Sequence, residues 1–392
     1  MMKIILSIAI VCFTFLSCTN EKHDVKFEKD GYFYIYATIN DSIEGRFLLD
    51  TGASGLYFDS TFVSQHNSII KSNLDTARMR GAGSTGYKQV FLIKDTIQIA
   101  VSNHTHSFTN SPILKLTYIN GENIAGIIGN EFIQNQILIF DNEHSVLKID
   151  SAVNPKNYET EIPFSYIDGR IYFPVDLNIN ENQKRTANLL MDLGCADAII
   201  LNSRYFNSLK AQNIIPKEII DYTILYGGAL GGNSNGGDFR ITSIKLGNDI
   251  IYNPIISFSK DTLGAFSQTN YDGLLGNEIL DRYNYAIDYR NQKLYLMKNG
   301  NSKKPFKSSL TGFYATKTND IATVMSVYYQ SEAYKNGLRL GDTIVSINNK
   351  KLIYLSEQEF YNELKLEGKT IKLTVLRSGE SVDILFLLKY LL

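Results

Sequence analysis

Two aspartates in matching contexts are the residues best suited to chemistry. Asp50 ends an apolar run within RFLLDTGAS, residues 46–54, and Asp192 has the same place within ANLLMDLGCADAIIL, residues 187–201. Aspartate is seldom buried without a partner. Two aspartates that each follow an apolar, core-type run therefore indicate a functional site. Two carboxyl groups about 3 Å apart cannot both ionise easily, so one stays protonated while the other is charged. Such a pair can activate a water molecule for attack on a carbonyl carbon, and the reaction needs no metal and no cofactor.

The sequence around the two aspartates is duplicated. DGYFYI at residues 30–35 returns as DGRIYF at 168–173, and GIIGNEFI at 126–133 returns as GLLGNEIL at 273–280. With the aspartate segments, these are three landmarks that recur in the same order and at nearly the same spacing. An internal repeat of this kind predicts two structural copies of one unit.

Two copies that pack about an approximate two-fold axis would bring the two aspartate turns together. Because glycine has no Cβ, Gly52 and Gly194 allow the two backbones to approach closely. The two carboxyl groups then share one space where the copies meet. The residues of the two turns are Asp50, Thr51 and Gly52 in the first copy, and Asp192, Leu193 and Gly194 in the second.

Short β-strands must position these turns. Residues 32–39, 137–140 and 146–149 are rich in β-branched, aromatic and other apolar side chains and are bounded by Gly, Asn and Asp, which is typical of strands joined by turns. The expected helices are few and short, near residues 130–134 and 277–281. The sequence therefore predicts a mainly β fold with two lobes, each of which positions one aspartate.

A polar breaker segment, residues 299–305, separates the duplicated part from a different pattern. Beyond it we expect a short helix at 331–336 and a second helix after a capping box that begins at Ser356. Two strands are expected to follow, at 370–377 and 381–388. This mixture indicates a separate α+β domain.

The duplicated part resembles the pepsin/retropepsin-type aspartic proteases, and in particular the retropepsin-like domains of bacterial lipoproteins that carry a C-terminal PDZ domain. DTGAS at residues 50–54 matches the Asp-Thr-Gly-Ala motif of the family, and IIG at 127–129 and LLG at 274–276 match its apolar-apolar-Gly element. The resemblance implies an internally duplicated, two-lobed β-barrel fold. It also implies an aspartic endopeptidase in which Asp50 and Asp192 form the catalytic dyad, with a peptide or protein as substrate.

The resemblance further implies glycine-rich flaps over the substrate. The first flap would lie in GAGSTG, residues 81–86, and the second in residues 227–237. The second segment lacks the Lys-Ser/Thr of a phosphate-binding loop, so a flap is favoured over nucleotide binding. The flap residues so assigned are Gly81, Ala82, Gly83, Gly228 and Gly231.

The stretch SEAYKNGLRLGDTIVSINNK, residues 331–350, resembles the PDZ domain of bacterial exported proteases, and the resemblance covers residues 306–392. A PDZ domain implies capture of a chain terminus or an extended segment by strand addition. The carboxylate-binding loop would lie at Gly312, Phe313 and Tyr314, with the helix after Ser356 as the other wall of the groove. The alternative is a spacer whose groove is buried against the protease.

Leu193 departs from the family pattern. The family has Thr or Ser after the catalytic aspartate, and its hydroxyl exchanges hydrogen bonds across the two turns. Leucine cannot form such bonds, so we expect Thr51 alone to hydrogen bond across the two turns. We call this one-sided set of bonds the clamp and expect a less rigid dyad from it. The alternative function is therefore a catalytically inactive, peptide-binding envelope lipoprotein.

The N-terminal residues indicate export. Lys3 precedes the apolar residues 4–16, which have the length of a signal-peptide core and are too few to span a bilayer as a stable helix. The following Leu16-Ser17-Cys18 resembles the lipobox of bacterial lipoproteins, which implies lipidation of Cys18 and a membrane anchor. An ordinary secretory signal is the alternative. The expected location is the envelope of a Gram-negative bacterium, facing the periplasm or the exterior.

Composition agrees with an exported globular protein. Thirty-nine Lys and Arg balance forty Asp and Glu, without a long run of one sign, so nucleic acid is not an expected partner. An internal duplication completes the site within one chain, so a monomer is expected. The predicted divisions are a signal peptide at 1–17, a lipidated tether at 18–24, protease lobe 1 at 25–155, protease lobe 2 at 156–298, a linker at 299–305 and a PDZ domain at 306–392.

Three other residues have side chains that could perform chemistry or bind a metal. With Cys12 in the signal and Cys18 lipidated, Cys195 is the one thiol left, and we interpret it as a small core residue because no histidine is near it in sequence. His104 and His106 face one side of an expected hairpin. Neither a cysteine nor a third histidine accompanies them, so no metal site is predicted.

Overall fold

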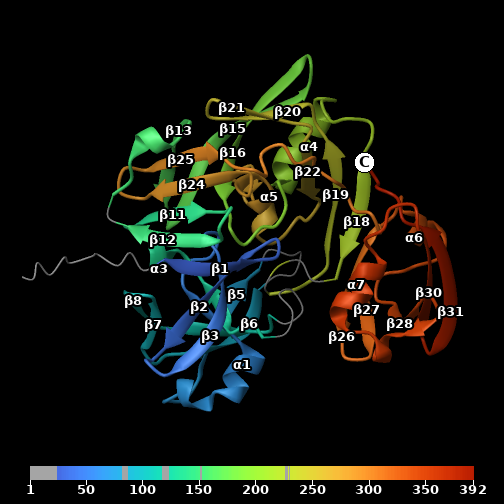
Figure 1. Ribbon diagram of the computed structural model, residues 1–392, viewed down its shortest axis with the longest axis horizontal. Helices are drawn as coiled ribbons and strands as arrows, with labels where there is room; N and C mark the ends of the chain where they lie inside the picture. Colours follow the sequence, from blue (N-terminus) through green and yellow to red (C-terminus); the bar gives the residue numbers. More distant parts are fainter. Residues whose placement is uncertain (1–23, 82–86, 117–122, 151, 226–227, 229) are drawn as a thin grey trace, which may run out of the picture.

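A computed structural model describes residues 24–392 except 82–86, 117–122, 151, 226–227 and 229. The signal-peptide and lipidation predictions therefore lie outside the described residues. Strands dominate the described chain, as the sequence predicts, and they form two lobes and a C-terminal domain (Figure 1). No helix among the described residues combines the length and the apolar character needed to cross a bilayer.

The strand that delivers Asp50 lies in the centre of lobe 1. β2 (Phe33–Ile39) and β3 (Ile43–Leu49) form a hairpin, and β10 (Gly126–Ile128) runs parallel to β3 with Ile127 opposite Leu48. On its other side β10 pairs antiparallel with β4 (Leu56–Asp59). The chain thus leaves β3 at Asp50, turns, and returns as β4 with β10 between the two strands.

Lobe 2 repeats this arrangement. β15 (Arg170–Asn180) and β16 (Gln183–Met191) form the hairpin, and β23 (Gly273–Leu275) runs parallel to β16 and antiparallel to β17 (Ile199–Leu201). The predicted internal duplication is confirmed, because each aspartate strand has the apolar-apolar-Gly strand of its own copy beside it. The predicted short helices are also present, as α3 (Asn130–Ile133) and α5 (Asn277–Leu280).

One sheet joins the two lobes. Its strands come from both copies, and Phe140 of lobe 1 stacks on Tyr285 of lobe 2 with ring centroids 4.6 Å apart. Burial of aromatic side chains on this scale holds the lobes in a fixed relation. The strands, in spatial order, are β13 (Thr160–Pro163), β25 (Lys293–Lys298), β24 (Tyr283–Asp288), β11 (Ile137–Asp141), β12 (Val146–Asp150) and β1 (Val25–Lys29).

The remaining elements complete each lobe. Lobe 1 adds α1 (Ser60–Gln65), β5 (Asp75–Arg80), β6 (Tyr87–Ile93), β7 (Ile97–Val101), β8 (His104–Phe108) and β9 (Ser111–Leu114). Lobe 2 adds β14 (Ser165–Ile167), α4 (Ser203–Ala211), β18 (Ile220–Ile224), β19 (Ser234–Arg240), β20 (Ser243–Leu246), β21 (Asp249–Tyr252) and β22 (Ile255–Ser259).

The C-terminal domain has its own hydrophobic core, centred on fully buried side chains such as Phe360 and Leu373. The predicted capping box is formed, because Ser356 and Glu359 bond to each other's backbone N–H. The elements are β26 (Phe313–Thr318), β27 (Ile321–Tyr328), α6 (Glu332–Lys335), β28 (Thr343–Ile347), β29 (Lys350–Lys351), α7 (Glu357–Glu363), β30 (Thr370–Arg377) and β31 (Glu380–Leu387).

A strand pairing attaches this domain to lobe 2. β18 pairs antiparallel with β27, with Tyr222 opposite Tyr328 and Ile224 opposite Ser326, so the sheet of lobe 2 continues into the C-terminal domain (Figure 1). The backbone N–H of Leu225 also donates to the carbonyl of Met325 (2.8 Å). No residue pattern in the two strands predicts this pairing.

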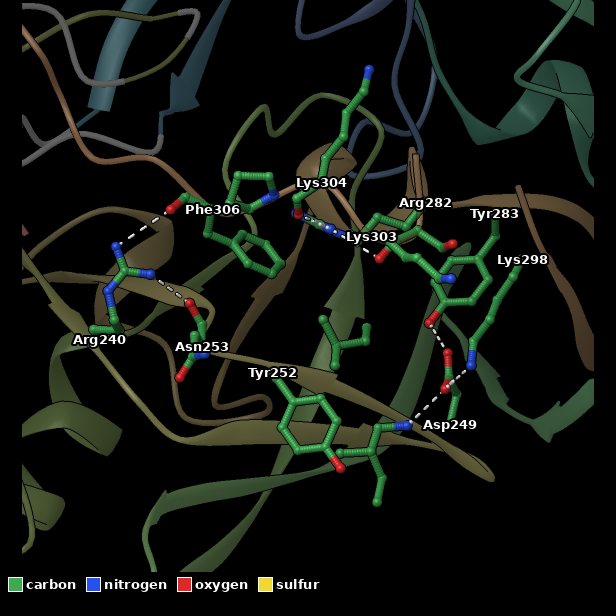
Figure 2. A pocket seen from close by; sticks show the side chains of 14 residues that line it. Arg240, Asp249, Tyr252, Asn253, Arg282, Tyr283, Lys298, Lys303, Lys304 and Phe306 are labelled. Carbon is green, nitrogen blue, oxygen red and sulfur yellow. Dashed lines mark hydrogen bonds and ion pairs between the residues drawn. The ribbon is translucent and has the colours of Figure 1, made fainter. Parts of the chain in front are cut away.

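A cavity of about 650 Å³ lies where the linker meets lobe 2, and Figure 2 shows the side chains that line it. Arg240, Arg282 and Lys298 in its lining are already bound within the protein. Arg240 donates to the carbonyls of Asn253, Phe306 and Leu392, and Lys298 pairs with Asp249 at 2.6 Å. The cavity contains neither aspartate of the dyad, so we interpret it as the junction that fastens the linker.

Candidate active site

Asp50 and Asp192 meet where the two lobes come together. The backbone N–H of Asp50 donates to the carbonyl of Ile128 (3.0 Å), and that of Asp192 donates to the carbonyl of Leu275 (2.9 Å). Each aspartate is thus held by the apolar-apolar-Gly strand of its own lobe. The two carboxyl groups hydrogen bond to each other, which requires a proton between them.

The turns approach so closely that glycine is required in both. A Cβ on Gly194 would lie 2.5 Å from Cγ of Asp50, and a Cβ on Gly52 would lie 2.9 Å from Cγ of Asp192. Both distances are shorter than any van der Waals contact between carbons. The absence of a side chain at these two positions is therefore what lets each turn contact the opposite carboxyl group.

The two carboxyl groups differ in their hydrogen-bond partners. Oδ1 of Asp50 accepts the backbone N–H groups of Gly52 (2.7 Å) and Ala53 (3.1 Å), whereas Oδ1 of Asp192 accepts that of Gly194 alone (2.8 Å). Burial raises the pKa of both groups. The charge of Asp50 and its hydrogen bond raise the pKa of Asp192 further, well above its usual range. The pKa of Asp192 is thus raised further than that of Asp50, which favours the shared proton on Asp192.

The clamp between the turns is one-sided. The buried hydroxyl of Thr51 donates to the carbonyl of Met191 (2.8 Å) and accepts the backbone N–H of Leu193 (3.0 Å). The side chain of Leu193 is fully buried and has no polar atom with which to return these bonds. One hydroxyl thus fixes the lobe 2 turn relative to the lobe 1 turn.

Two asparagines that sequence reasoning missed support the turns from behind. The side-chain amide of Asn130 donates to the carbonyl of Thr51, and that of Asn277 donates to the carbonyl of Leu193 (2.8 Å). Both asparagines are almost completely buried, at 1% and 0% exposure. The repeated Gly-Asn-Glu of the third landmark was the signal that could have identified them.

Arg170 is a second residue that sequence reasoning missed. It begins β15 in lobe 2, and its Nε donates to the carbonyl of Gly52 in lobe 1 (3.1 Å). Its positive charge lowers the pKa of both Asp50 and Asp192, against the larger effect of burial. The internal repeat does not indicate Arg170, because the matching position of the first copy is Tyr32.

Replacing Arg170 with glutamine should move the pH–rate profile of the dyad to higher pH. Without the cation, the ionised forms of both carboxyl groups are less favourable, so both apparent pKa values rise. The measurement is kcat/KM for one peptide from acid to neutral pH. Arg170→Lys, which keeps the charge, should shift the profile less, and an unchanged profile in Arg170→Gln would contradict an electrostatic role.

The predicted flap residues lie on two segments that contact each other. A Cβ on Gly81 would lie 2.6 Å from Cβ of Leu230, and the carbonyl of Gly81 accepts the backbone N–H of Ala265 (3.2 Å). In the second segment the backbone N–H of Gly231 donates to the carbonyl of Gly228 (2.9 Å). Ala82 and Gly83 lie outside the described residues.

The predicted PDZ loop is already hydrogen bonded within itself. Gly312 has φ +70°, which favours glycine, and its N–H donates to the hydroxyl of Ser309 (3.0 Å). The N–H of Phe313 donates to the hydroxyl of Thr311 (3.3 Å), and the Phe313 ring is buried in the domain core. Tyr314 is half exposed. The N–H groups that a terminal carboxylate would need are thus bound to hydroxyls of the same loop.

His104, His106 and Cys195 have structural roles. Nε2 of His104 hydrogen bonds to the carbonyl of Phe132 (3.1 Å), and His106 packs against Phe108 on the β7–β8 hairpin. Within the described ranges, no three His, Cys, Asp or Glu side chains are grouped as a metal site would need. Cys195 is buried, and burial raises the pKa of its thiol well above the usual value, which disfavours a nucleophilic thiolate.

Comparison with known families agrees with this geometry. A family model described as aspartyl protease matches residues 35–132, and one described as PDZ domain matches residues 309–385. A search of curated proteins found no significant relative. The chain therefore carries an aspartyl protease domain followed by a PDZ domain. The first match contains Asp50 and the Gly-Ile-Ile-Gly element, whereas lobe 2 and Asp192 are linked to it by the duplicated strand arrangement.

Proposed function

We propose that this chain is an aspartic endopeptidase in which Asp50 and Asp192 activate a water molecule against a peptide bond. The observation that supports the proposal is the contact between two carboxyl groups, one from each lobe, with unequal hydrogen-bond support. Coupled carboxyl groups with separated pKa values provide one acid and one base at the same pH.

The unequal support assigns the roles. Asp50, charged and stabilised by two backbone N–H groups, accepts a proton from the water as its oxygen attacks the carbonyl carbon. Asp192 donates its proton to the carbonyl oxygen, so the tetrahedral intermediate forms as a neutral diol. Asp50 then gives its proton to the amide nitrogen while Asp192 takes a proton from one hydroxyl of the diol, so the C–N bond breaks to an amine and a carboxylic acid and the dyad returns to its starting state. Thr51 fixes the distance between the two turns during these steps.

Peptide hydrolysis by the purified chain tests the proposal. The chain without residues 1–18 is incubated with a peptide mixture from acid to neutral pH, and cleavage is followed by mass spectrometry. We expect cleavage by the wild-type chain and none by Asp50→Asn or Asp192→Asn. Cleavage that survives both substitutions would show that another group, or a contaminant, performs the reaction.

A peptide-binding protein without catalysis is the second candidate, and Leu193 is the observation that favours it. A clamp with one hydroxyl allows more motion between the turns, and misplacement by about 1 Å can cost about 10²-fold in rate. Binding of peptides to the wild-type chain without any cleavage across the pH range would select this candidate.

We propose that the PDZ domain presents peptides to the protease cleft. A PDZ domain implies peptide binding, and β26 has β27 on one side and α7 near its other edge. Tyr314 of β26 lies near Tyr32 of lobe 1, close enough for its charge to affect the pKa of Tyr32. A peptide bound along β26 would therefore lie near the β2–β3 hairpin beside the dyad.

Tyr361 closes the binding edge of β26 in this state. Its hydroxyl donates to the carbonyl of Ala315 (3.1 Å) and accepts the backbone N–H of Lys317, the groups that an added strand would bond. A peptide that binds along β26 must first displace this hydroxyl, which costs about 1 kcal/mol. The phenylalanine variant has no hydroxyl to displace. We therefore expect Tyr361→Phe to bind peptide ligands of the domain about fivefold more tightly in a fluorescence anisotropy titration. Weaker binding by the variant would instead make the hydroxyl a ligand contact.

We propose that the protein is a lipoprotein of the Gram-negative envelope, anchored through Cys18. The support is the sequence pattern of residues 1–18. Incorporation of a labelled fatty acid by the wild-type chain, and its loss in Cys18→Ala, is the expected result. Export without lipid incorporation would favour the ordinary secretory signal. A monomer is expected by size-exclusion chromatography with light scattering, because one chain supplies both aspartates.

A further inference from the structure

A second cavity lies where lobe 2 meets the PDZ domain. It has a volume of about 110 Å³, enough for the end of one long side chain. Asp197, which lines it, follows Asp192 in the same segment, and burial and the charges of Asp197, Asp192 and Asp50 all raise the pKa of the Cys195 thiol between them. The residues that line it are Asp197, Tyr222, Ile224, Ser257, Ser326 and Tyr328.

The cavity is built from both domains. Tyr222 and Ile224 come from β18 of lobe 2, and Ser326 and Tyr328 come from β27, its pairing partner in the PDZ domain. The two tyrosine rings meet edge to face with centroids 5.2 Å apart. The pairing of β18 with β27 thus places PDZ side chains in the wall of this cavity.

Asp197 faces the cavity, and no cation among the described residues pairs with it. The residue is exposed, desolvation by the surrounding protein raises its pKa to about 6, and no charge of a neighbouring cation opposes that effect. The groups whose titration it affects are acids, phenols and a thiol: Asp238, Glu278, Tyr222, Tyr328, Tyr32 and Cys195. A carboxylate in such surroundings gains more from a cationic ligand than a carboxylate in bulk water does.

A second carboxyl group lies directly behind the cavity wall. Oδ2 of Asp238 accepts the hydroxyl of Tyr328 (2.8 Å), and Asp238 also bonds to the hydroxyl of Ser257. Its Oδ1 is buried and has no hydrogen-bond partner among the described residues, although Asp238 is only 6% exposed. Burial and the charge of Asp197 raise the pKa of Asp238 to about 7, so Asp238 adds negative charge to the cavity above that pH.

We propose that this cavity is a specificity subsite for a lysine or arginine side chain of the bound peptide, with its outer wall supplied by the PDZ domain. Asp197 pairs with the charged group, the rings of Tyr222 and Tyr328 offer cation–π contacts, and Ile224 packs against the methylene groups. The inference rests on the proposed protease function, because it names the substrate class of that site. The preferred substrates are peptides with a basic residue a few positions from the cleaved bond.

The test compares peptides that differ only in charge at one position. C-terminally amidated peptides, which offer no terminal carboxylate to the PDZ loop, carry lysine or the neutral norleucine at each position around the cleaved bond. We expect the wild-type chain to show kcat/KM at least about tenfold higher for lysine at one position. In Asp197→Asn the ratio should fall to near one. Glu181→Gln, which removes an exposed charge at the β15–β16 turn, should keep the wild-type ratio.

A binding arm separates this inference from the protease function. The same peptides are titrated against Asp192→Asn and against Asp192→Asn/Asp197→Asn, where no turnover is needed. A preference for lysine in the first variant and its loss in the second supports the subsite even if the wild-type chain cleaves nothing. Equal binding of lysine and norleucine peptides overturns the subsite even if the wild-type chain is a protease. If Tyr328→Leu keeps the wild-type ratio between lysine and norleucine peptides, the PDZ domain does not contribute to the subsite.

Discussion

Replacing Asp192 with asparagine should lower kcat/KM for peptide hydrolysis by about 10⁴-fold, the upper range for loss of a positioned general acid. Asparagine keeps the size of the side chain and its acceptor oxygen for Gly194, but it has no proton to give to the carbonyl oxygen of the substrate. Asp50→Asn should have an effect of the same size, because the base is then absent.

The control is the affinity for a non-cleaved peptide, which both variants should keep within about threefold. A rate that falls by less than about tenfold in either variant would contradict the assigned dyad. Glu181→Gln is the matched neutralisation away from the dyad, and its rate should equal that of the wild-type chain.

The same Asp192→Asn substitution should stabilise the fold at neutral pH. Burial and the charge of Asp50 raise the pKa of Asp192, so the folded protein keeps a proton that the unfolded chain releases above a pH of about 3.9. Wild-type stability is therefore lost as pH rises through the raised pKa. Asparagine cannot ionise, so the gain in unfolding free energy should be near zero at pH 3 and about 1–3 kcal/mol at pH 7. Urea denaturation at the two pH values measures it, and a gain that is larger at pH 3 would contradict the direction of the shift.

Replacing Thr51 with valine should have the second large effect, on stability and rate together. Valine matches the shape of threonine but leaves the carbonyl of Met191 and the N–H of Leu193 without their buried partner. Each unsatisfied group costs about 1–3 kcal/mol, so we expect a loss of about 2–4 kcal/mol in unfolding free energy. The loosened turns should also lower kcat by about 10²-fold.

Thr51→Ser is the matched control for this prediction, because serine keeps the hydroxyl and loses only a methyl group. It should retain most of the rate and lose about 1 kcal/mol of stability. Equal losses in Thr51→Ser and Thr51→Val would mean that packing of the methyl group, and not the hydrogen bonds, holds the turns.

The sequence was informative where a local pattern determines a local structure. Strand and helix positions followed from side-chain periodicity and capping, and the capping box at Ser356 formed as predicted. The one-sided clamp also followed, because the residue types Thr51 and Leu193 decide which turn can offer a hydroxyl. The repeat predicted that the two aspartate turns meet.

The sequence did not predict contacts between segments that are far apart in the chain. The pairing of β18 with β27 uses backbone groups, which every residue carries, so no residue type marks it. Arg170 reaches across to Gly52 from a position where the first copy has tyrosine, so the repeat could not identify it. The hydrogen bonds within the PDZ loop were not predicted either, because the motif does not indicate that Ser309 and Thr311 bind its N–H groups.

The shared proton is tested most directly by a ¹³C NMR titration of the aspartate carboxyl carbons in the wild-type chain and in Asp192→Asn. We predict two coupled steps in the wild-type chain, the later one far above the ordinary aspartate pKa of about 3.9, and the absence of that pair of steps in the variant. If the variant instead loses a single signal that titrates near the ordinary value, the two carboxyl groups hold no common proton and the proposed mechanism is wrong.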